Sequence, residues 1–210
     1  MVKFSGKVKY LPNGFFSDLA DIDLSKIKKE KIILTVGRLG TYQKNTELLV
    51  ETIINLQDKL DGWKVYLVGP MTGNFKKYLE DILLKYPKLR EIIIVIGNIS
   101  DKEELYKIYA KSSIFVLTSR FEGSPLVVPE AMHFSCFPII TDCFPAIGDV
   151  IPNDLYGYIV KNKADLQDKI EHVINDNRVL NLGENTSKYV DKNFDWCNLS
   201  YVLSKYFQEV

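Results

Sequence analysis

Short runs of apolar and β-branched residues recur along this chain, separated by stretches with helical spacing. Runs of four to six residues suit strands that are buried on both faces of a parallel sheet. The runs that predict strands are Lys31–Val36, Trp63–Val68, Ile92–Ile96, Ile114–Leu117, Phe137–Ile140 and a last short one at Tyr156–Val160. The stretches that predict helices are Asn45–Leu60, Phe75–Tyr86, Ser100–Ser112, Leu126–Phe134, Lys163–Asn175, Val179–Val190 and a final helix that opens at Asp195-Trp196. This alternation predicts an α/β fold with a doubly wound, Rossmann-like parallel sheet.

The ends of the predicted strands carry glycine or small polar residues. Gly37, Gly69 and Gly97 each follow a strand, and Glu122 lies on the loop after the fourth one. Because the carboxyl ends of parallel strands meet at one edge, doubly wound folds bind their ligands beyond that edge. We therefore expect the functional site there.

The turn after the first strand reads Gly37-Arg38-Leu39-Gly40, and a helix follows it. A glycine-bearing turn between a strand and a helix offers backbone amides to a phosphate. Arg38 presents a fork of donors and Lys44 a point charge, which together suit the oxygens of a diphosphate. The turn lacks the Gly-x-Gly-x-x-Gly spacing, which disfavours a dehydrogenase. The alternative is that both cations are solvated surface charges.

The loop after the fourth strand carries a second candidate group. Gly123 lets the backbone approach a ligand closely, and Ser124-Pro125 predicts a helix cap followed by a first-turn proline. Glu122 on the loop and Glu130 in the helix have seven residues between them, so both can face one crevice. The alternative is that both are ordinary surface acids.

This segment, EGSPLVVPEAM at residues 122–132, resembles the signature of the retaining GT-B glycosyltransferases that use nucleotide-sugar donors. Their pattern is Glu-Gly, six variable residues, then Glu-Ala-Met. The acid, the glycine, the spacing and the final Ala-Met all agree. The resemblance implies that Arg38 and Lys44 clamp the donor diphosphate and that Glu122 contacts the transferred sugar, so these three are the catalytic candidates.

The resemblance also implies a set of binding residues for the donor. Glu130 pairs with ribose hydroxyls, and Ile99 forms an apolar wall for the base, although a plain strand-to-helix connection explains Ile99 equally well. The candidates at which the backbone meets the donor are Gly37, Gly123, Ser124 and Leu126. Pro125 has no amide to donate, whereas many relatives carry glycine there, and this puts one donor contact in doubt.

The beginning of the chain bears on the domain organisation. Pro12-Asn13-Gly14 is a turn signal, and it resembles the link between the two domains of the family. We expect a linker-like segment at residues 1–30, a nucleotide-sugar-binding domain at 31–190 and a C-terminal helix at 191–210. The half that binds the glycan or lipid-linked acceptor would then be absent from this chain. Whether it was removed or belongs to a partner chain stays open.

Composition argues against several classes of protein. The 210 residues include 27 basic and 27 acidic side chains, so the chain has no electrostatic footprint for nucleic acid. Three cysteines without metal-ligand spacing suit a reducing cytosol. The first ten residues lack the apolar core of a signal peptide, and no apolar run approaches the roughly 20 residues of a membrane helix. We expect a cytoplasmic protein, with a peripheral position at the inner membrane face as a further option.

We expect no cofactor and no metal, because the resemblance makes the nucleotide sugar a substrate held by cations and amides. Asp21 and Asp23 copy the acidic metal-binding pair of another glycosyltransferase architecture, but they precede the first strand and we assign them no metal.

Two hypotheses about function remain. The first is the donor domain of a retaining glycosyltransferase for glycan or glycolipid assembly, inactive without its acceptor half. The second is a noncatalytic nucleotide-binding or interaction module with the same fold.

Overall fold

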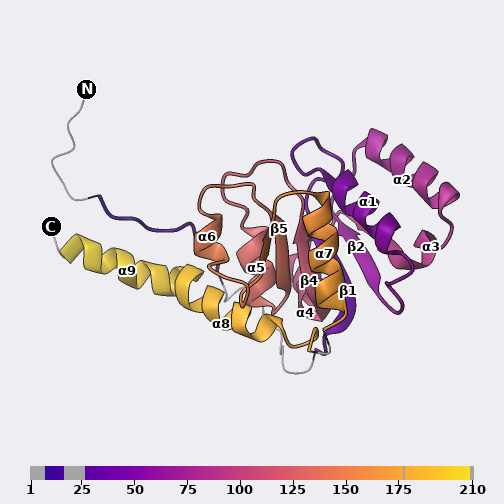
Figure 1. Cartoon of the computed structure of the whole chain (residues 1–210). Helices are drawn as coiled ribbons and strands as arrows, with labels where there is room; N and C mark the ends of the chain where they lie inside the picture. The colour runs from indigo at the N-terminus through magenta and orange to yellow at the C-terminus, as the bar shows by residue number, and fades with distance from the viewer. Residues whose placement is uncertain (1–7, 17–26, 177, 209–210) are drawn as a thin grey trace.

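A parallel six-stranded sheet forms the centre of the molecule (Figure 1). The computed structural model describes residues 8–16, 27–176 and 178–208. The order of the strands is β3-β2-β1-β4-β5-β6, and every neighbouring pair is parallel. Their bounds are β1 Glu30–Val36, β2 Lys64–Val68, β3 Ile93–Gly97, β4 Ser112–Leu117, β5 Phe137–Thr141 and β6 Tyr158–Val160. The predicted doubly wound α/β fold is confirmed.

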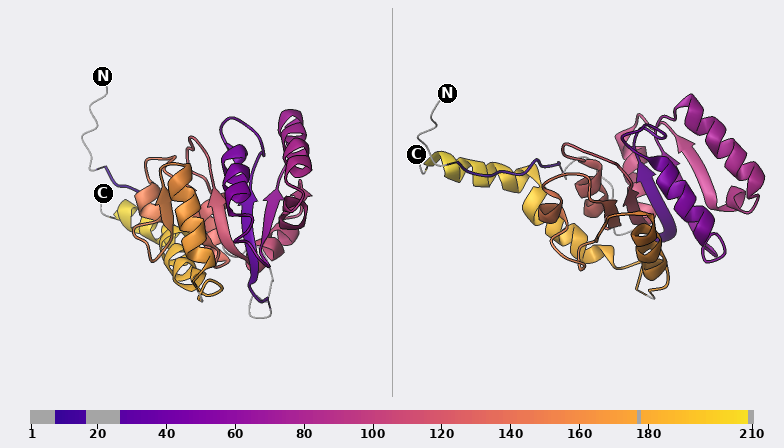
Figure 2. Two further views of the ribbon diagram at one scale, coloured as in Figure 1. Left: turned by 45° about the vertical axis from the view of Figure 1, so that its right-hand side comes forward. Right: turned by 45° about the horizontal axis from the view of Figure 1, so that its top comes forward.

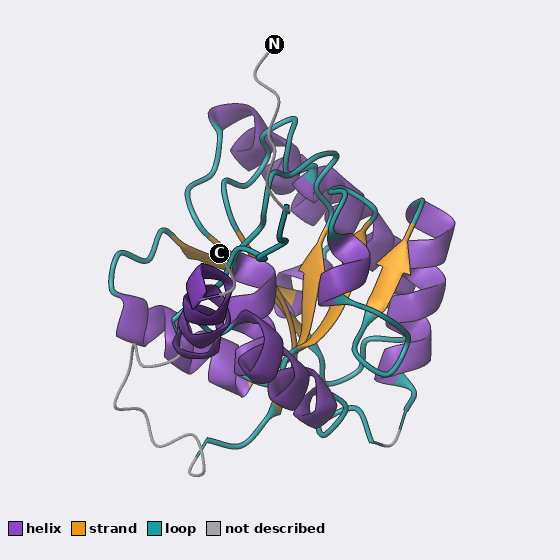
Figure 3. Ribbon diagram, turned by 90° about the vertical axis from the view of Figure 1, so that its left-hand side faces the viewer, coloured by secondary structure: helices purple, strands orange, loops and turns teal. Residues whose placement is uncertain are grey.

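Helices cover both faces of the sheet (Figures 2 and 3). The helices described are α1 Thr46–Leu56, α2 Gly73–Lys85, α3 Leu89–Ile92, α4 Lys102–Lys111, α5 Val127–His133, α6 Ile147–Val150, α7 Lys163–Ile174, α8 Gly183–Phe194 and α9 Trp196–Gln208. Residues from α1, α2, α3 and α7 pack with one set of strand side chains, among them Ile33 and Ile114. Residues from α4, α5, α6 and α8 pack with the opposite set, among them Leu34 and Phe115. Successive strand residues therefore point to different cores, as a sheet buried on both faces requires.

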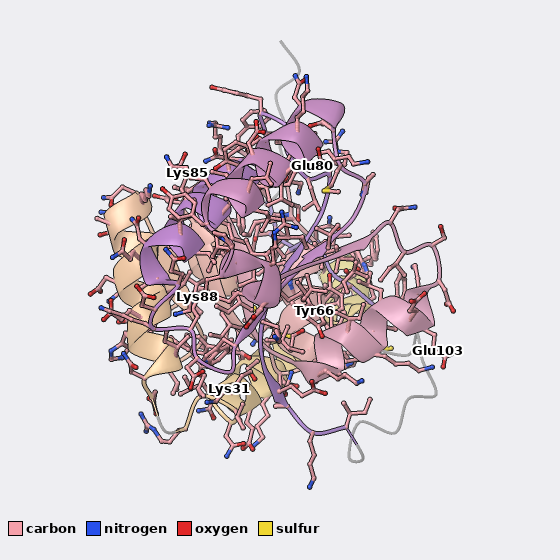
Figure 4. All side chains as sticks on the ribbon, turned by 90° about the vertical axis from the view of Figure 1, so that its right-hand side faces the viewer. Lys31, Tyr66, Glu80, Lys85, Lys88 and Glu103 are labelled. Atoms are coloured by element: carbon pink, nitrogen blue, oxygen red, sulfur yellow. The ribbon has the colours of Figure 1, made fainter. Side chains whose placement is uncertain are left out.

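The two faces can be seen from the free edge of the sheet at β3 (Figure 4). In this view Glu80 lies on α2 and Glu103 on α4, on opposite sides of the sheet. The connection after β1 leads to α1 on one face, while the connection after β4 leads to α5 on the other. Because β1 and β4 are neighbours, the chain changes faces between them, which is the switch point where doubly wound folds bind ligands.

Several predicted details of the helices were wrong. The helix α1 ends at Leu56 rather than Leu60, and the short helices α3 and α6 were not predicted. The helix predicted to start at Ser100 begins at Lys102, and Asp101 caps it, since its carboxylate accepts a hydrogen bond from the Glu103 amide. Ser124 does not cap α5. That helix begins at Val127 after a helical Leu126, without a side-chain cap bond.

The segment before β1 docks on the end of the chain. The Phe15 amide donates to the Phe194 carbonyl over 2.9 Å, and the Trp196 amide donates to the Phe15 carbonyl over 2.9 Å. A Cβ atom on Gly14 would lie 2.6 Å from the Phe194 carbonyl oxygen, so the close approach requires glycine. Asp195 accepts from the Cys197 amide at the start of α9, which confirms the predicted opening of that helix.

The helix α9 extends away from the sheet, with residues 8–16 near it (Figure 1). Within the described part of the chain, no helix is long and apolar enough to cross a membrane. Asp21 and Asp23 lie outside the described residues. The division into a linker, a binding domain and a C-terminal helix stays a prediction.

Candidate functional site

An ion pair joins the two predicted loops across the switch point. Lys44 Nζ lies 2.6 Å from Glu122 Oε1, and their side chains are only 16% and 8% exposed. Lys44 lies two residues before α1, next to the cap residue Asn45, which adopts a left-handed conformation (φ 48°). The Thr118 hydroxyl at the end of β4 donates to the Lys44 and Asn45 carbonyls over 3.1 and 3.0 Å. The end of β4 thus fixes the turn that presents Lys44.

Glu122 has two further partners that sequence reasoning missed. The Ser119 hydroxyl donates to Oε1 over 2.6 Å, and Gln43 Nε2 donates to Oε2 over 3.0 Å. The Glu122 amide also donates to the Cys143 carbonyl over 2.7 Å. These bonds, with the ion pair, compensate the carboxylate for its burial. In the sequence, the only indication of these two partners is their position: Gln43 precedes Lys44, and Ser119 comes shortly after the fourth predicted strand.

Arg38 joins this group through Gln43. One Nη atom of Arg38 donates to Gln43 Oε1 over 2.8 Å, while most of the Arg38 side chain is exposed. The structure therefore places both predicted cations beside Glu122, Lys44 by direct contact and Arg38 through one intervening amide. An exposed guanidinium and a partly buried ammonium, held at the same edge of the sheet, can meet the oxygens of a diphosphate.

Glu130 lies in a separate part of the site. Among the described residues it makes no hydrogen bond or ion pair with Arg38, Lys44 or Glu122. Burial raises the pKa of the Glu130 carboxyl, and the charge of Lys102 at the start of α4 opposes that rise. Glu130 in turn raises the pKa of Tyr106, although burial is the larger cause. The carboxylate therefore faces α4 rather than the Lys44–Glu122 pair, so the structure does not bring Glu130 into contact with Glu122.

Ile99 lies on the same side of the sheet as Glu130. It is half-buried and packs against the core cluster that contains Tyr106 and Val128. Its loop connects β3 to α4, the helix whose Lys102 acts on Glu130. The predicted wall for the base and the predicted ribose ligand thus flank the same helix.

In the turns at Gly37 and Gly123, the absence of a side chain leaves space beside the backbone. A Cβ atom on Gly37 would lie 3.2 Å from Lys44 Cε, so the glycine makes room for that lysine. A Cβ atom on Gly123 would meet no heavy atom within 4 Å. The amides of Gly123, Ser124 and Leu126 donate no hydrogen bond within residues 8–16, 27–176 and 178–208. Gly123 and Ser124 also line a cavity of about 160 Å³.

No group of three or more His, Cys, Asp or Glu side chains in the described ranges could hold a metal ion. The expectation that the donor binds without a metal stays a prediction.

Comparison with curated proteins identifies relatives of this chain. The sequence model of the family described as glycosyl transferases group 1 matches residues 18–193. The amylovoran biosynthesis glycosyltransferase AmsD of Erwinia amylovora is 34% identical over 133 residues, which are 63% of this chain and 35% of that protein. The N-acetylgalactosamine-N,N'-diacetylbacillosaminyl-diphospho-undecaprenol 4-alpha-N-acetylgalactosaminyltransferase of Campylobacter jejuni is 28% identical over 180 residues, 85% of this chain and 47% of that protein. The chain thus spans less than half the length of these two relatives.

Solved structures show the same architecture. The C-terminal domain of a glycosyl transferase group 1 family protein (LpcC) from Francisella tularensis matches with a TM-score of 0.70 at 27% identity, covering 82% of this chain and 90% of that one. Sucrose-phosphate synthase from Thermosynechococcus elongatus shares the fold with a TM-score of 0.74 at 22% identity, covering 98% of this chain and 53% of that one. The chain therefore belongs to the group 1 glycosyltransferase family, and its Rossmann-like sheet is the C-terminal-type domain of the GT-B fold.

Proposed function

We propose that this chain binds a nucleotide-diphosphate sugar as the donor domain of a retaining hexosyltransferase. The observation that carries the proposal is the buried Lys44–Glu122 pair at the switch point, with Arg38 linked to it through Gln43. A nucleoside diphosphate brings negative oxygens for the two cations, and its sugar brings hydroxyls for the carboxylate. The site thus contains a complementary group for each part of such a donor.

The chemistry follows from where charge develops. Breaking the bond between the anomeric carbon and the diphosphate leaves negative charge on the phosphate oxygens. Cations and amides that are already oriented lower the barrier, because they stabilise that charge without reorganising. Arg38 and Lys44 supply the cations, and the amides of Gly123, Ser124 and Leu126 supply further donors. Each charge-assisted hydrogen bond contributes about 1.5–3 kcal/mol.

The remaining predicted residues bind the nucleoside and the sugar. Glu130 is an acceptor-only carboxylate once ionised, which suits a pair of ribose hydroxyls. Ile99 offers an apolar surface to the base, and Gly37 keeps the first turn open. Glu122 accepts hydrogen bonds from the hydroxyls of the transferred sugar. The donor is a substrate in this scheme, and no metal ion or cofactor takes part.

The acceptor requires a second half. The relatives are more than twice as long as the part that this chain matches, and their names refer to amylovoran biosynthesis and to a diphospho-undecaprenol acceptor. By analogy the acceptor of the complete enzyme is a glycan or a lipid-linked glycan at the cytoplasmic face of a membrane. The isolated chain is expected to transfer no sugar, so detectable turnover by residues 1–210 alone would contradict this part of the proposal.

Calorimetric titration of the isolated chain with UDP, GDP, ADP and their glucose conjugates tests the proposal. We expect one base to bind with a Kd between about 1 µM and 1 mM, and Lys44→Ala and Glu130→Ala to weaken that binding by about tenfold or more. The alternative is a noncatalytic module with the same fold. It gains support if no nucleotide binds, or if both variants bind like the wild type.

A further inference from the structure

Gln43 links Arg38 to the Lys44–Glu122 pair, and among the described residues no other side chain bonds to the side chains of both Arg38 and Glu122. Its Oε1 accepts from Arg38 over 2.8 Å, and its Nε2 donates to Glu122 Oε2 over 3.0 Å and to the Phe121 carbonyl over 3.2 Å. Its own carbonyl accepts from the Arg120 amide over 2.8 Å. One residue of the β1–α1 loop therefore holds the β4–α5 loop by both backbone and side chain.

A bound diphosphate would change the surroundings of Lys44 and Glu122. Lys44 Nζ is 2.6 Å from Glu122, so phosphate oxygens must compete with that carboxylate for the ammonium. When Lys44 turns to the phosphates, Glu122 loses its charged partner while its side chain, 8% exposed, has little access to water. A buried carboxylate that loses a partner either rearranges or is destabilised. The Ser119 hydroxyl and the Gln43 amide are the groups that remain to hold it.

We propose that Gln43 is a positioning residue of the donor site, an assignment that rests on the proposed function. Its amide nitrogen keeps Glu122 directed at the sugar after Lys44 has moved to the diphosphate. Its amide oxygen aims the guanidinium of Arg38 at the same diphosphate. Gln43 thereby couples recognition of the sugar to recognition of the phosphates, although it touches neither.

A primary amide suits this task, because it donates and accepts through two atoms of one plane. Glutamate at position 43 keeps an acceptor for Arg38 but cannot donate to Glu122, and it places two carboxylates side by side. Leucine keeps the approximate volume and removes both bonds. The two substitutions therefore separate the two arms of the network.

The test measures the Kd of UDP and of UDP-glucose, or of the GDP or ADP pair if the wild type prefers that base. We expect Gln43→Glu to bind the nucleoside diphosphate within about twofold of wild type and to lose roughly tenfold in affinity for the nucleotide sugar, since one hydrogen bond to a charged group is lost. We expect Gln43→Leu to weaken binding of both. Gln167→Leu is the matched control, because Gln167 is also a half-buried glutamine, and its side chain accepts an exposed hydrogen bond from Asn55 between α7 and α1.

Thermal unfolding of each variant separates positioning from folding. The proposal is supported if both Gln43 variants melt close to the wild type, if the ratio of the two Kd values changes in both, and if the Kd of the nucleoside diphosphate itself rises only in Gln43→Leu. It is overturned if both variants bind both ligands like the wild type, or if the ratio stays constant while affinity and Tm fall together. A wild-type chain that binds no nucleotide overturns the proposed function, and the role of Gln43 with it. A wild type that binds while the Gln43 variants are unaffected refutes only the role of Gln43.

Discussion

Two lysines lie at opposite edges of the same sheet, and their partners differ in kind. Lys44, at the carboxyl edge, pairs with the carboxylate of Glu122. Lys29 lies just before β1 at the amino edge, and its ammonium donates to the backbone carbonyls of Tyr109, Ser112 and Phe134. Burial lowers the pKa of Lys29, while the neighbouring Cys136 thiol opposes that change.

The difference between the two sets of partners shows which of the two lysines has a partner that can be displaced. Backbone carbonyls at the ends of α4 and α5 cannot leave, so Lys29 fastens these helices to the sheet. Under the proposed function, the phosphate oxygens of a ligand replace the Glu122 carboxylate as the partner of Lys44. The same residue type is structural at one edge and available for binding at the other, because of what surrounds it.

The largest effect on stability is expected from Lys29→Met. The substitution keeps the approximate length of the side chain and removes the ammonium from three carbonyls. Those of Tyr109 and Ser112 then share the weak thiol donor of Cys136, and that of Phe134 loses its side-chain donor. We expect a loss of about 3 kcal/mol in the free energy of unfolding, at about 1–3 kcal/mol for each unsatisfied buried group partly relieved by water. That loss corresponds to a decrease in Tm of roughly 6–12 °C. Urea denaturation measures it, and a folded fraction that binds nucleotide with altered affinity would contradict a purely structural role.

The matched substitution at the carboxyl edge, Lys44→Met, should reduce ligand affinity more than it reduces stability. We expect affinity for the nucleoside diphosphate to fall about 10- to 150-fold, the equivalent of about 1.5–3 kcal/mol. The free energy of unfolding should change by less than in Lys29→Met, since Ser119 and Gln43 still hold Glu122.

Calorimetry and urea denaturation of the same samples give both quantities for Lys44→Met. Lys163→Met is the control, because its ion pair with Glu51 is exposed and should contribute no more than about 1 kcal/mol. If Lys44→Met destabilises the fold as much as Lys29→Met, the contrast between the two edges is lost.

The smallest expected effect concerns Glu130. Burial raises the pKa of its carboxyl in the folded protein, so the folded state binds the proton more tightly than the unfolded state does. Stability therefore falls as the pH rises from the ordinary range of a glutamate through the raised value, and the deficit persists at neutral pH. Glu130→Gln should raise Tm at pH 7, and the gain should vanish below about pH 4.

Melting curves of wild type and Glu130→Gln between pH 4 and pH 8 test this sign. The opposite trend, a variant that gains stability only in acid, would show that the carboxylate is stabilised rather than destabilised by its surroundings. Loss of nucleotide binding in the more stable variant would indicate that the site keeps Glu130 at a cost in stability.

Much of the fold followed from local patterns. Apolar runs such as Ile114–Leu117 alternate with amphipathic stretches, and that period suffices to predict a parallel sheet covered on both faces. The spacing of Glu122 and Glu130, with Gly123 and Ala131-Met132, was enough to indicate the family. Helix ends were harder, because a cap is decided by a single hydrogen bond. Asp101 and Ser100 are both good caps by type, and only the folded backbone shows which one accepts the bond.

The sequence by itself therefore determined the class of fold and the family, and it predicted at which edge of the sheet the charged candidate residues lie. Tertiary structure decided which of these residues meet. The loops that carry Lys44 and Glu122 are 78 positions apart, and they touch only because β1 and β4 are neighbours in the sheet. Gln43 carries no motif, and Glu130 shares one with Glu122 yet faces α4 instead. A periodic pattern records what each element buries, whereas the partner of a polar side chain depends on how distant elements pack.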